Sequence, residues 1–295
     1  MKTSNHLLRR LTAALLAAVL ALSIALPVFA SDDGDTIYIN SVSDLLSLAR
    51  NCAYDQWSVG KTVILQKDLS LEGMLWEPIP SFSGQFKGNG HTISDLTITG
   101  QYSPAGLFGI VEEQGSIESL SVRGVVSVSD SADTTTGGIV GVNHGTLINC
   151  QFTGVVTGDS EVGGIVGRNE SEGTIDHSTA RAIVTGKSST GGIAGYNLGA
   201  ITGCTNVGSI NTEYPEASLD TDGFTAKMVD YINNKMAAAD NDATNSVTNV
   251  ATDTGGIAGR SSGMILTSVN TGTIGYEHVG YNVGGIVGRK IGRAS

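Results

Sequence analysis

The chain has 295 residues, and its 17 lysines and arginines against 28 aspartates and glutamates give a net charge of −11. The basic residues are scattered singly, so the acidic surface argues against nucleic acid or an anionic membrane as a partner. Glycine occurs 40 times without collagen spacing, which indicates turns and close backbone approaches at fixed positions.

The first thirty residues have the pattern of a secretory signal peptide. A basic start is followed by an uncharged apolar run at residues 11–26, and Ala30 ends the pattern of a cleavage site. We expect residues 1–30 to be removed, leaving a secreted, extracellular chain at the cell surface with no transmembrane segment. An uncleaved membrane anchor is the alternative, but the run is short for a span.

Residues 41–52 predict a short helix within an N-terminal capping segment at 31–60. Ser43 is a candidate N-cap. The repeat described next forms a stack whose first coil would be open, and we expect the helix to cover it. Its apolar face comprises Leu45, Leu48, Ala49 and Cys52.

One seven-residue unit, close to GGIVGRN, occurs five times in the rest of the chain. Regular spacing of this kind indicates a repeat architecture. A degenerate copy, AGLFG at 105–109, precedes the first unit. The second glycine of each pair falls at Gly138, Gly164, Gly192, Gly256 and Gly285, with spacings of 26, 28, 64 and 29 residues.

Each period holds three short extended segments: the GIVG piece and two more, around Ile117 and ending at Val126 in the first copy. They are rich in Ile, Val and Thr and leave no room for a crossover helix. Parallel strands connected in this way must coil, so residues 61–292 predict an all-β fold, a right-handed parallel β-helix. The expected interior ladder is Leu107, Ile139, Ile165, Ile193, Ile257 and Ile286.

The spacing of 64 residues indicates one period plus an insert at residues 211–253. Within it, residues 223–239 predict an amphipathic helix that packs on a coil face, with a partner-binding groove as the alternative. At the other end, residues 293–295 follow a coil that has only begun. We therefore expect a fragment or truncated product, with further domains beyond Ser295.

The repeated unit resembles the GLUG motif family of bacterial surface and secreted proteins. The segments WEPI at 76–79, FKGNGHTI at 86–93 and GLFG at 106–109 resemble the family as well. The likeness covers roughly residues 60–292, apart from the insert. It implies a β-helix-like repeat region of an extracellular protein, sometimes beside peptidase or anchoring domains, and it implies no catalytic residues.

The three cysteines, Cys52, Cys150 and Cys204, are predicted to be buried free thiols. Cys150 and Cys204 share a column of the repeat, but Ser178 lies between them. Two coils separate them by about 9.6 Å, beyond the limit of about 7 Å for a disulfide. Paired ligands typical of a zinc site are absent from the sequence.

Two polar columns belong to the repeated unit itself. Asn143, Asn169 and Asn197 are expected to form a structural asparagine ladder. Ser261 lies in the same column, and its GRSSG context matches the G-x-S-x-G hydrolase pattern, although the repeat already accounts for both glycines. The preceding column holds Val142, Arg168, Tyr196, Arg260 and Arg289, either a solvated face or a groove for an acidic glycan.

The histidines and loop acids show no metal motif. His91, His144, His177 and His278 lack the H-E-x-x-H pattern of metallopeptidases. The acid pairs are interpreted as solvated loop residues, with weak calcium binding as the alternative. These pairs are Asp130 with Asp133, Asp159 with Glu161, and Asp220 with Asp222.

The sequence favours a non-enzymatic stalk or adhesin-like binder of extracellular glycans or host proteins, with no catalytic residue, cofactor or metal site. The first alternative is a polysaccharide lyase or hydrolase, for which Asp159, Glu161 and Glu172 are the nearest candidate acids. The second is the spacer region of a larger surface peptidase whose catalytic domain lies outside this chain.

Overall fold

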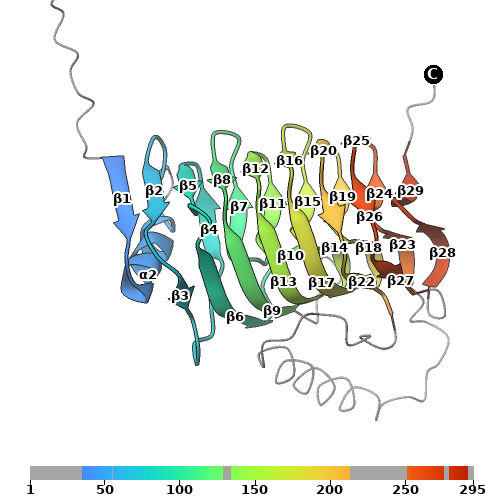
Figure 1. Cartoon of the computed structure of the whole chain (residues 1–295), viewed down its shortest axis with the longest axis horizontal. Coiled ribbons are helices and arrows are strands. Elements are labelled where there is room, and N and C mark those ends of the chain that lie inside the picture. The colour runs from blue at the N-terminus through green and yellow to red at the C-terminus, as the bar shows by residue number, and fades with distance from the viewer. Residues whose placement is uncertain (1–34, 55, 129–133, 213–250, 276–278, 292–295) are drawn as a thin grey trace, which may run out of the picture. The chain divides into compact units, whose positions relative to one another are not determined.

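The computed structural model describes residues 35–54, 56–128, 134–212, 251–275 and 279–291. They form a right-handed parallel β-helix built from four sheets, in which each strand pairs with the equivalent strand of the next coil (Figure 1). This confirms the fold class predicted from the repeat. The expected signal peptide (1–30), insert helix (223–239) and chain end (293–295) lie outside the described residues.

The eight-stranded sheet supplies one wall of the core. The middle residue of its short strands is buried in coil after coil, as with Phe86, Ile117 and Leu147, because alternate residues of a strand face opposite sides. Its strands are β1 (Thr36–Ile39), β2 (Thr62–Leu65), β5 (Gln85–Lys87), β8 (Ser116–Glu118), β12 (Thr146–Ile148), β16 (Thr174–Asp176), β20 (Ala200–Thr202) and β25 (Met264–Leu266).

A residue in the left-handed conformation turns the chain from this sheet into the nine-stranded sheet in most coils. Asn89, Ser119, Asn149 and His177 have φ values of 53°, 52°, 53° and 45°, a conformation that asparagine adopts more readily than most residues. The nine-stranded sheet consists of β3 (Leu69–Ser70), β6 (Thr92–Gly100), β9 (Ser121–Val128), β13 (Gln151–Thr157), β17 (Thr179–Thr185), β21 (Thr205–Asn206), β22 (Ser209–Ile210), β26 (Val269–Asn270) and β27 (Thr273–Ile274).

The seven-stranded sheet contains the second half of each repeated unit. Its strands begin after the GGI triplet, at Val140, Val166 and their equivalents, so the extended segment starts two residues later than the predicted GIVG piece. The strands are β4 (Ile79–Phe82), β7 (Phe108–Val111), β11 (Val140–Asn143), β15 (Val166–Asn169), β19 (Ala194–Asn197), β24 (Ala258–Ser261) and β29 (Val287–Lys290).

The fourth sheet has five strands, each ending at the first glycine of a glycine pair, and the sequence did not predict it. Three segments were expected in each period, and the complete coils have four. Several of the missed strands, such as SEVG, SSTG and ATDTG, combine polar residues and glycine with few large apolar residues, so they lack the apolar alternation of a strand. They are β10 (Thr136–Gly137), β14 (Ser160–Gly163), β18 (Ser188–Gly191), β23 (Ala251–Gly255) and β28 (Val279–Gly284).

The repeated glycines allow these two sheets, and neighbouring coils, to approach through their backbones. A Cβ atom on Gly195 would overlap the backbone of Glu161, which lies in the five-stranded sheet. A Cβ atom on Gly164 would overlap the carbonyl oxygen of Gly192 in the next coil. This close packing, together with the turn, explains why the glycines recur at the same positions.

The pairing register explains the spacing of 64 residues. Gly191 pairs with Gly255 and Asn197 pairs with Ser261, so these coils are neighbours and the extra residues form an insert. Two predicted boundaries differ from the structure. β23 begins at Ala251, inside the predicted insert (211–253), and β1 pairs with β2 although it lies in the predicted capping segment.

The single helix among the described residues, α2 (Val42–Asn51), packs against β1 and β4 and covers the first coil (Figure 1). Its N-cap is Ser41 rather than the predicted Ser43, because Ser41 is the last extended residue and its Oγ accepts a hydrogen bond from the backbone N–H of Asp44. Leu45, Leu48 and Cys52 are buried as predicted, and Ala49 packs against the same core.

The interior ladder follows the prediction except at its last member. Leu107, Ile139, Ile165, Ile193 and Ile257 are fully buried. Ile286, in the last coil, is 40% exposed because no described coil follows it. Among the described residues, no helix has the length and apolar character needed to cross a membrane.

Candidate functional site

The most distinctive polar side chains form one row on the seven-stranded sheet, which we call the arginine–tyrosine row. Parallel pairing places Arg168 of β15, Tyr196 of β19, Arg260 of β24 and Arg289 of β29 in successive coils. Val142 of β11 precedes them in register. The column predicted from the repeat is therefore confirmed as a row of neighbours.

Arg168 is neutralised within its own coil. Its Nη1 lies 2.8 Å from Oε1 of Glu161, and its Nε lies 2.6 Å from Oε1 of Glu170. Burial by itself would lower the pKa of Arg168, but the hydrogen bond to Glu170 and the charge of Glu161 raise it. Two carboxylates therefore occupy this guanidinium.

Tyr196 lies between two guanidinium groups. The Cζ atoms of Arg168 and Arg260 lie 5.0 and 5.4 Å from its ring centroid, within the range of cation–π contacts. Because Arg168 and Arg260 belong to the coils on either side, the three planar groups stack along the axis. This contact stabilises the row and restricts the conformations of both arginines.

Arg260 and Arg289 have fewer protein partners than Arg168. Among the described residues, no carboxylate lies within ion-pair distance of Arg260, and its buried Nε has no hydrogen-bond partner. Nη1 of Arg289 lies 3.9 Å from Oδ2 of Asp253, too far for a hydrogen bond. Asp253 itself accepts a hydrogen bond of 2.6 Å from Nδ2 of Asn282.

The asparagine column forms the predicted structural ladder. Nδ2 of Asn143 donates to Oδ1 of Asn169 at 2.8 Å, and Nδ2 of Asn169 donates to Oδ1 of Asn197 at 2.9 Å. Ser261 continues the ladder, since its Oγ accepts from Asn197 at 3.3 Å and donates to the carbonyl oxygen of Gly263. The hydroxyl of the G-x-S-x-G match is thus buried in a structural network.

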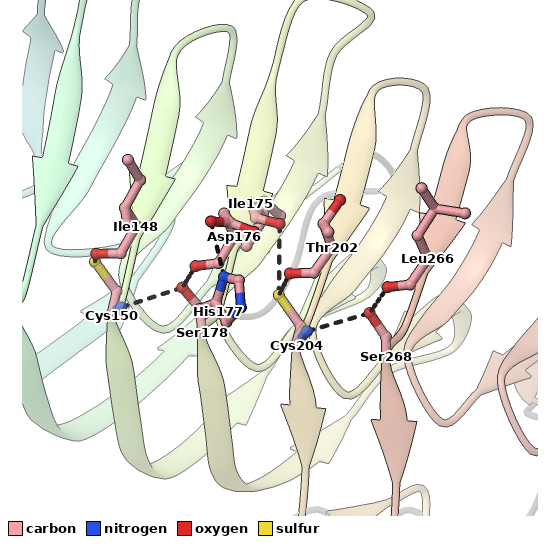
Figure 2. Close-up of polar contacts among 10 residues, drawn as sticks. All are labelled: Ile148, Cys150, Ile175, Asp176, His177, Ser178, Thr202, Cys204, Leu266 and Ser268. Carbon is pink, nitrogen blue, oxygen red and sulfur yellow. Dashed lines mark hydrogen bonds and ion pairs between the residues drawn. The ribbon is translucent and has the colours of Figure 1, made fainter.

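The cysteine column alternates with serine along the coils (Figure 2). The backbone N–H of Cys150 donates to Oγ of Ser178 at 3.1 Å, and that of Cys204 donates to Oγ of Ser268 at 3.2 Å. All three thiols are free and buried, as predicted. Burial raises the pKa of Cys150 to about 12 and those of Cys52 and Cys204 to about 11.

The candidate acids of a polysaccharide-active enzyme do not converge on one point. Asp159 pairs with Lys187 at 2.6 Å, and Glu161 pairs with Arg168. Glu172 is exposed, and a hydrogen bond from Ser171 lowers its pKa. Within the described ranges, no group of three or more His, Cys, Asp or Glu side chains is placed to hold a metal ion.

Two histidines pair locally with a carboxylate. Nδ1 of His91 lies 3.2 Å from Asp68, and Nδ1 of His177 lies 2.8 Å from its neighbour Asp176. His144 lies near Glu112 and Glu113 at the edge of a shallow hollow. The remaining predicted candidates, His278, Asp130, Asp133, Asp220 and Asp222, lie outside the described residues.

Residues 158–185, which contain Glu161 and Arg168, match the family model described as the GLUG motif. The chain carries the GLUG motif. This confirms the resemblance inferred from the repeated unit. The matched segment corresponds to one coil, from just before β14 to the end of β17.

Two relatives share sequence with part of this chain. Over 155 residues, 48% of this chain, the sequence is 31% identical to halomucin of Haloquadratum walsbyi, but the match spans 2% of halomucin. Over 137 residues, 34% of this chain, it is 29% identical to a protein assigned as a Gly-rich membrane protein of Evansella cellulosilytica, and the match spans 16% of that protein. The similarity thus covers a small part of each relative.

Two solved structures share the fold. A protein from Bacteroides ovatus assigned as an immunoglobulin A1 protease superposes with a TM-score of 0.56 at 18% identity, covering 81% of this chain and 66% of that one. An IgA1 protease superposes with a TM-score of 0.53 at 12% identity, covering 90% of this chain and 21% of that one. At these identities the likeness establishes the β-helix fold alone.

Sequence reasoning missed Asp253 and the ion pairs of Arg168 as parts of the site. Glu161 precedes Arg168 by seven residues, and Asp253 precedes Arg260 by the same number. Aligning the residues before the glycine pairs would have placed both acids beside the row. Their contacts nevertheless differ, and that difference depends on packing between coils.

Proposed function

We propose that this chain is a secreted or cell-surface repeat module that acts as a non-enzymatic stalk or adhesin-like binder. In this role it presents the side of its coils to extracellular glycans or host proteins. The continuous parallel register carries the proposal, because it holds outward side chains in fixed rows at a spacing of about 4.8 Å. A long, regular side face of this kind suits an extended ligand.

The local ion pairs support a binding role rather than a catalytic one. A lyase or hydrolase needs acids with perturbed pKa values that converge on one bond. Here each acid forms an ion pair with a neighbouring basic side chain, Asp159 with Lys187 and Glu161 with Arg168. These contacts fix the acids as parts of the coil surface.

The relatives and the leader sequence support a surface location. One relative is named halomucin and the other a Gly-rich membrane protein. The first thirty residues carry the secretory pattern described above. Together they favour display outside the cell.

A second candidate is the spacer region of a larger surface peptidase. The observation that favours it is the fold likeness to two proteins named as IgA1 proteases. In that case the β-helix would position a catalytic domain encoded elsewhere in a longer protein. The sequence encoded downstream of Ser295 in the gene distinguishes this candidate from a self-contained binder.

A glycan array probed with residues 31–295 tests the main proposal, with mass spectrometry of any bound glycan after incubation. We expect binding without change in the mass of the glycan. Shortened or unsaturated products would contradict the non-enzymatic role. Absence of binding to every glycan and to immobilised host-surface proteins would leave the spacer role as the better explanation.

A further inference from the structure

The two halves of the arginine–tyrosine row differ in charge balance. The first half contains Arg168, and the second half contains Arg260 and Arg289. In the first half, Glu161 and Glu170 both contact Arg168. In the second half, the position equivalent to Glu170 is Ser262, which carries no charge. Arg289 has one nearby carboxylate, that of Asp253, and Arg260 has none within ion-pair distance among the described residues, so this half of the row carries excess positive charge.

Arg260 and Arg289 are direct neighbours across two paired strands. Like charges at such positions repel each other, since the strands lie only about 4.8 Å apart. Asp253 offsets this repulsion only in part, because its nearest oxygen lies 3.9 Å from Arg289 and it also binds Asn282. An oxyanion bridging the two guanidinium groups would offset the repulsion and accept hydrogen bonds from their N–H groups.

Arg260 is also held in place for such a ligand. Its guanidinium stacks on Tyr196 at 5.4 Å, which limits its rotation. A restrained side chain loses less conformational entropy on binding than a free one. The side chain of Arg289 is 52% exposed, so a ligand can reach this half of the row from solvent.

We propose that Arg260 and Arg289 form a binding subsite for an oxyanionic group, a carboxylate or a sulfate ester, of an extracellular polysaccharide. This inference rests on the proposed binding role and names the place and the ligand class. It also revises the earlier expectation for the column: Arg168 is occupied by its own carboxylates, so the ligand contacts the Arg260 half.

The spacing of the coils favours a saccharide over an acidic peptide. Side chains on one face of an extended peptide recur about every 6.8 Å, twice the rise per residue, and fall out of step with coils about 4.8 Å apart. A single sugar ring is close to one coil spacing in length. The acidity of the whole chain does not prevent binding at this site, because salt screens charges more than about 10 Å away.

The experiment measures binding of the chain to polygalacturonate and to dextran sulfate, which present a carboxylate and a sulfate respectively. Arg260→Ala and Arg289→Ala should each weaken binding of at least one polymer by about tenfold or more. Arg260→Lys keeps the positive charge but loses the planar guanidinium, so its affinity should lie between that of the unmodified chain and that of Arg260→Ala. Arg181→Ala, at an exposed position of β17, is the matched control and should bind as the unmodified chain does.

The outcomes separate this inference from the proposed function. If neither polymer binds, or if Arg260→Ala binds as tightly as Arg181→Ala, the subsite is wrong. Tighter binding to polyglutamate than to both polymers would also overturn it. If a neutral glycan or a host protein binds and the arginine variants have no effect, the binding role stands without this subsite. Circular dichroism of each variant confirms that the coil is intact.

Discussion

The two ends of the described β-helix bury their last coils to different degrees. At the start, α2 covers the first coil, and Leu45 is fully buried. At the other end, Ile286 is 40% exposed, whereas Ile257, the same residue one coil earlier, is fully buried. In a solenoid a coil contacts only its neighbours, so identical sequence units are core or surface depending on what lies next to them.

The largest expected effect contrasts two equivalent glycines. In Gly256→Ala the new Cβ would overlap the carbonyl oxygen of Gly285, so we expect this variant to fail to fold or to aggregate. Gly285 has nothing within 4 Å of the same position, and Gly285→Ala should fold normally. Circular dichroism and size-exclusion chromatography measure both. Equal behaviour of the two variants would contradict the difference between inner and terminal coils.

The isoleucine ladder gives the next contrast. Ile257→Ala removes a fully buried side chain and should lower the free energy of unfolding by about 2–5 kcal/mol. Ile286→Ala should cost less than half as much, because that side chain is already partly exposed. Urea denaturation of the two variants provides the comparison. A larger loss for Ile286→Ala would show that the last coil is covered in solution.

The asparagine ladder gives a third contrast, between two buried polar side chains of one column. Asn169 is fully buried and bonds to ladder neighbours on both sides, so Asn169→Ala should cost about 1–3 kcal/mol by leaving polar groups unpaired. Ser261 has a longer contact of 3.3 Å to its ladder neighbour, and Ser261→Ala should cost less. Thermal unfolding ranks the two, and the reverse ranking would argue against the ladder as a stabilising network.

Alkaline pH tests burial along the coils. The pKa of the Cys150 thiol is raised from 9.0 to about 12, so the unfolded chain loses this proton at lower pH than the folded chain. The contribution of the buried thiol to the free energy of unfolding is therefore complete below pH 9 and is lost as pH rises toward 12. At about pH 10 the loss is roughly 1 kcal/mol. Cys150→Ser should flatten this part of the stability–pH curve. An unchanged curve would mean that the thiol is accessible to solvent.

The smallest expected effect lies at the covered end. Ser41→Ala removes the N-cap of α2 and should cost about 1 kcal/mol. Fraying of the helix should speed the reaction of Cys52, the buried C-cap residue of α2, with a thiol reagent, and leave Cys150 unaffected. Ser43→Ala, at the position first expected to be the cap, is the matched control. Equal rates for both thiols in Ser41→Ala would contradict a capping role for α2.

Most of the architecture could be predicted from the sequence because every coil repeats the same local requirements. The spacing of Gly164, Gly192 and their equivalents predicted the coils, and the buried isoleucines, the asparagine ladder and the free thiols followed from it. The five-stranded sheet was missed because its strands, such as SEVG and SSTG, lack the alternation of large apolar residues that predicts a strand. The cap of α2 was misplaced because Ser41 and Ser43 are equally good N-cap residues by type, and only the end of β1 distinguishes them.

The candidate site shows what the sequence could not determine. The sequence by itself placed Arg168, Tyr196, Arg260 and Arg289 in one column, since the repeat sets the register. Only the tertiary structure showed that Glu161 and Glu170 occupy Arg168 while Arg260 has no such partner. The physical reason is that the repeat sets the register of the strands through regular backbone pairing. An ion pair depends instead on where the side chains of neighbouring segments meet in the folded chain.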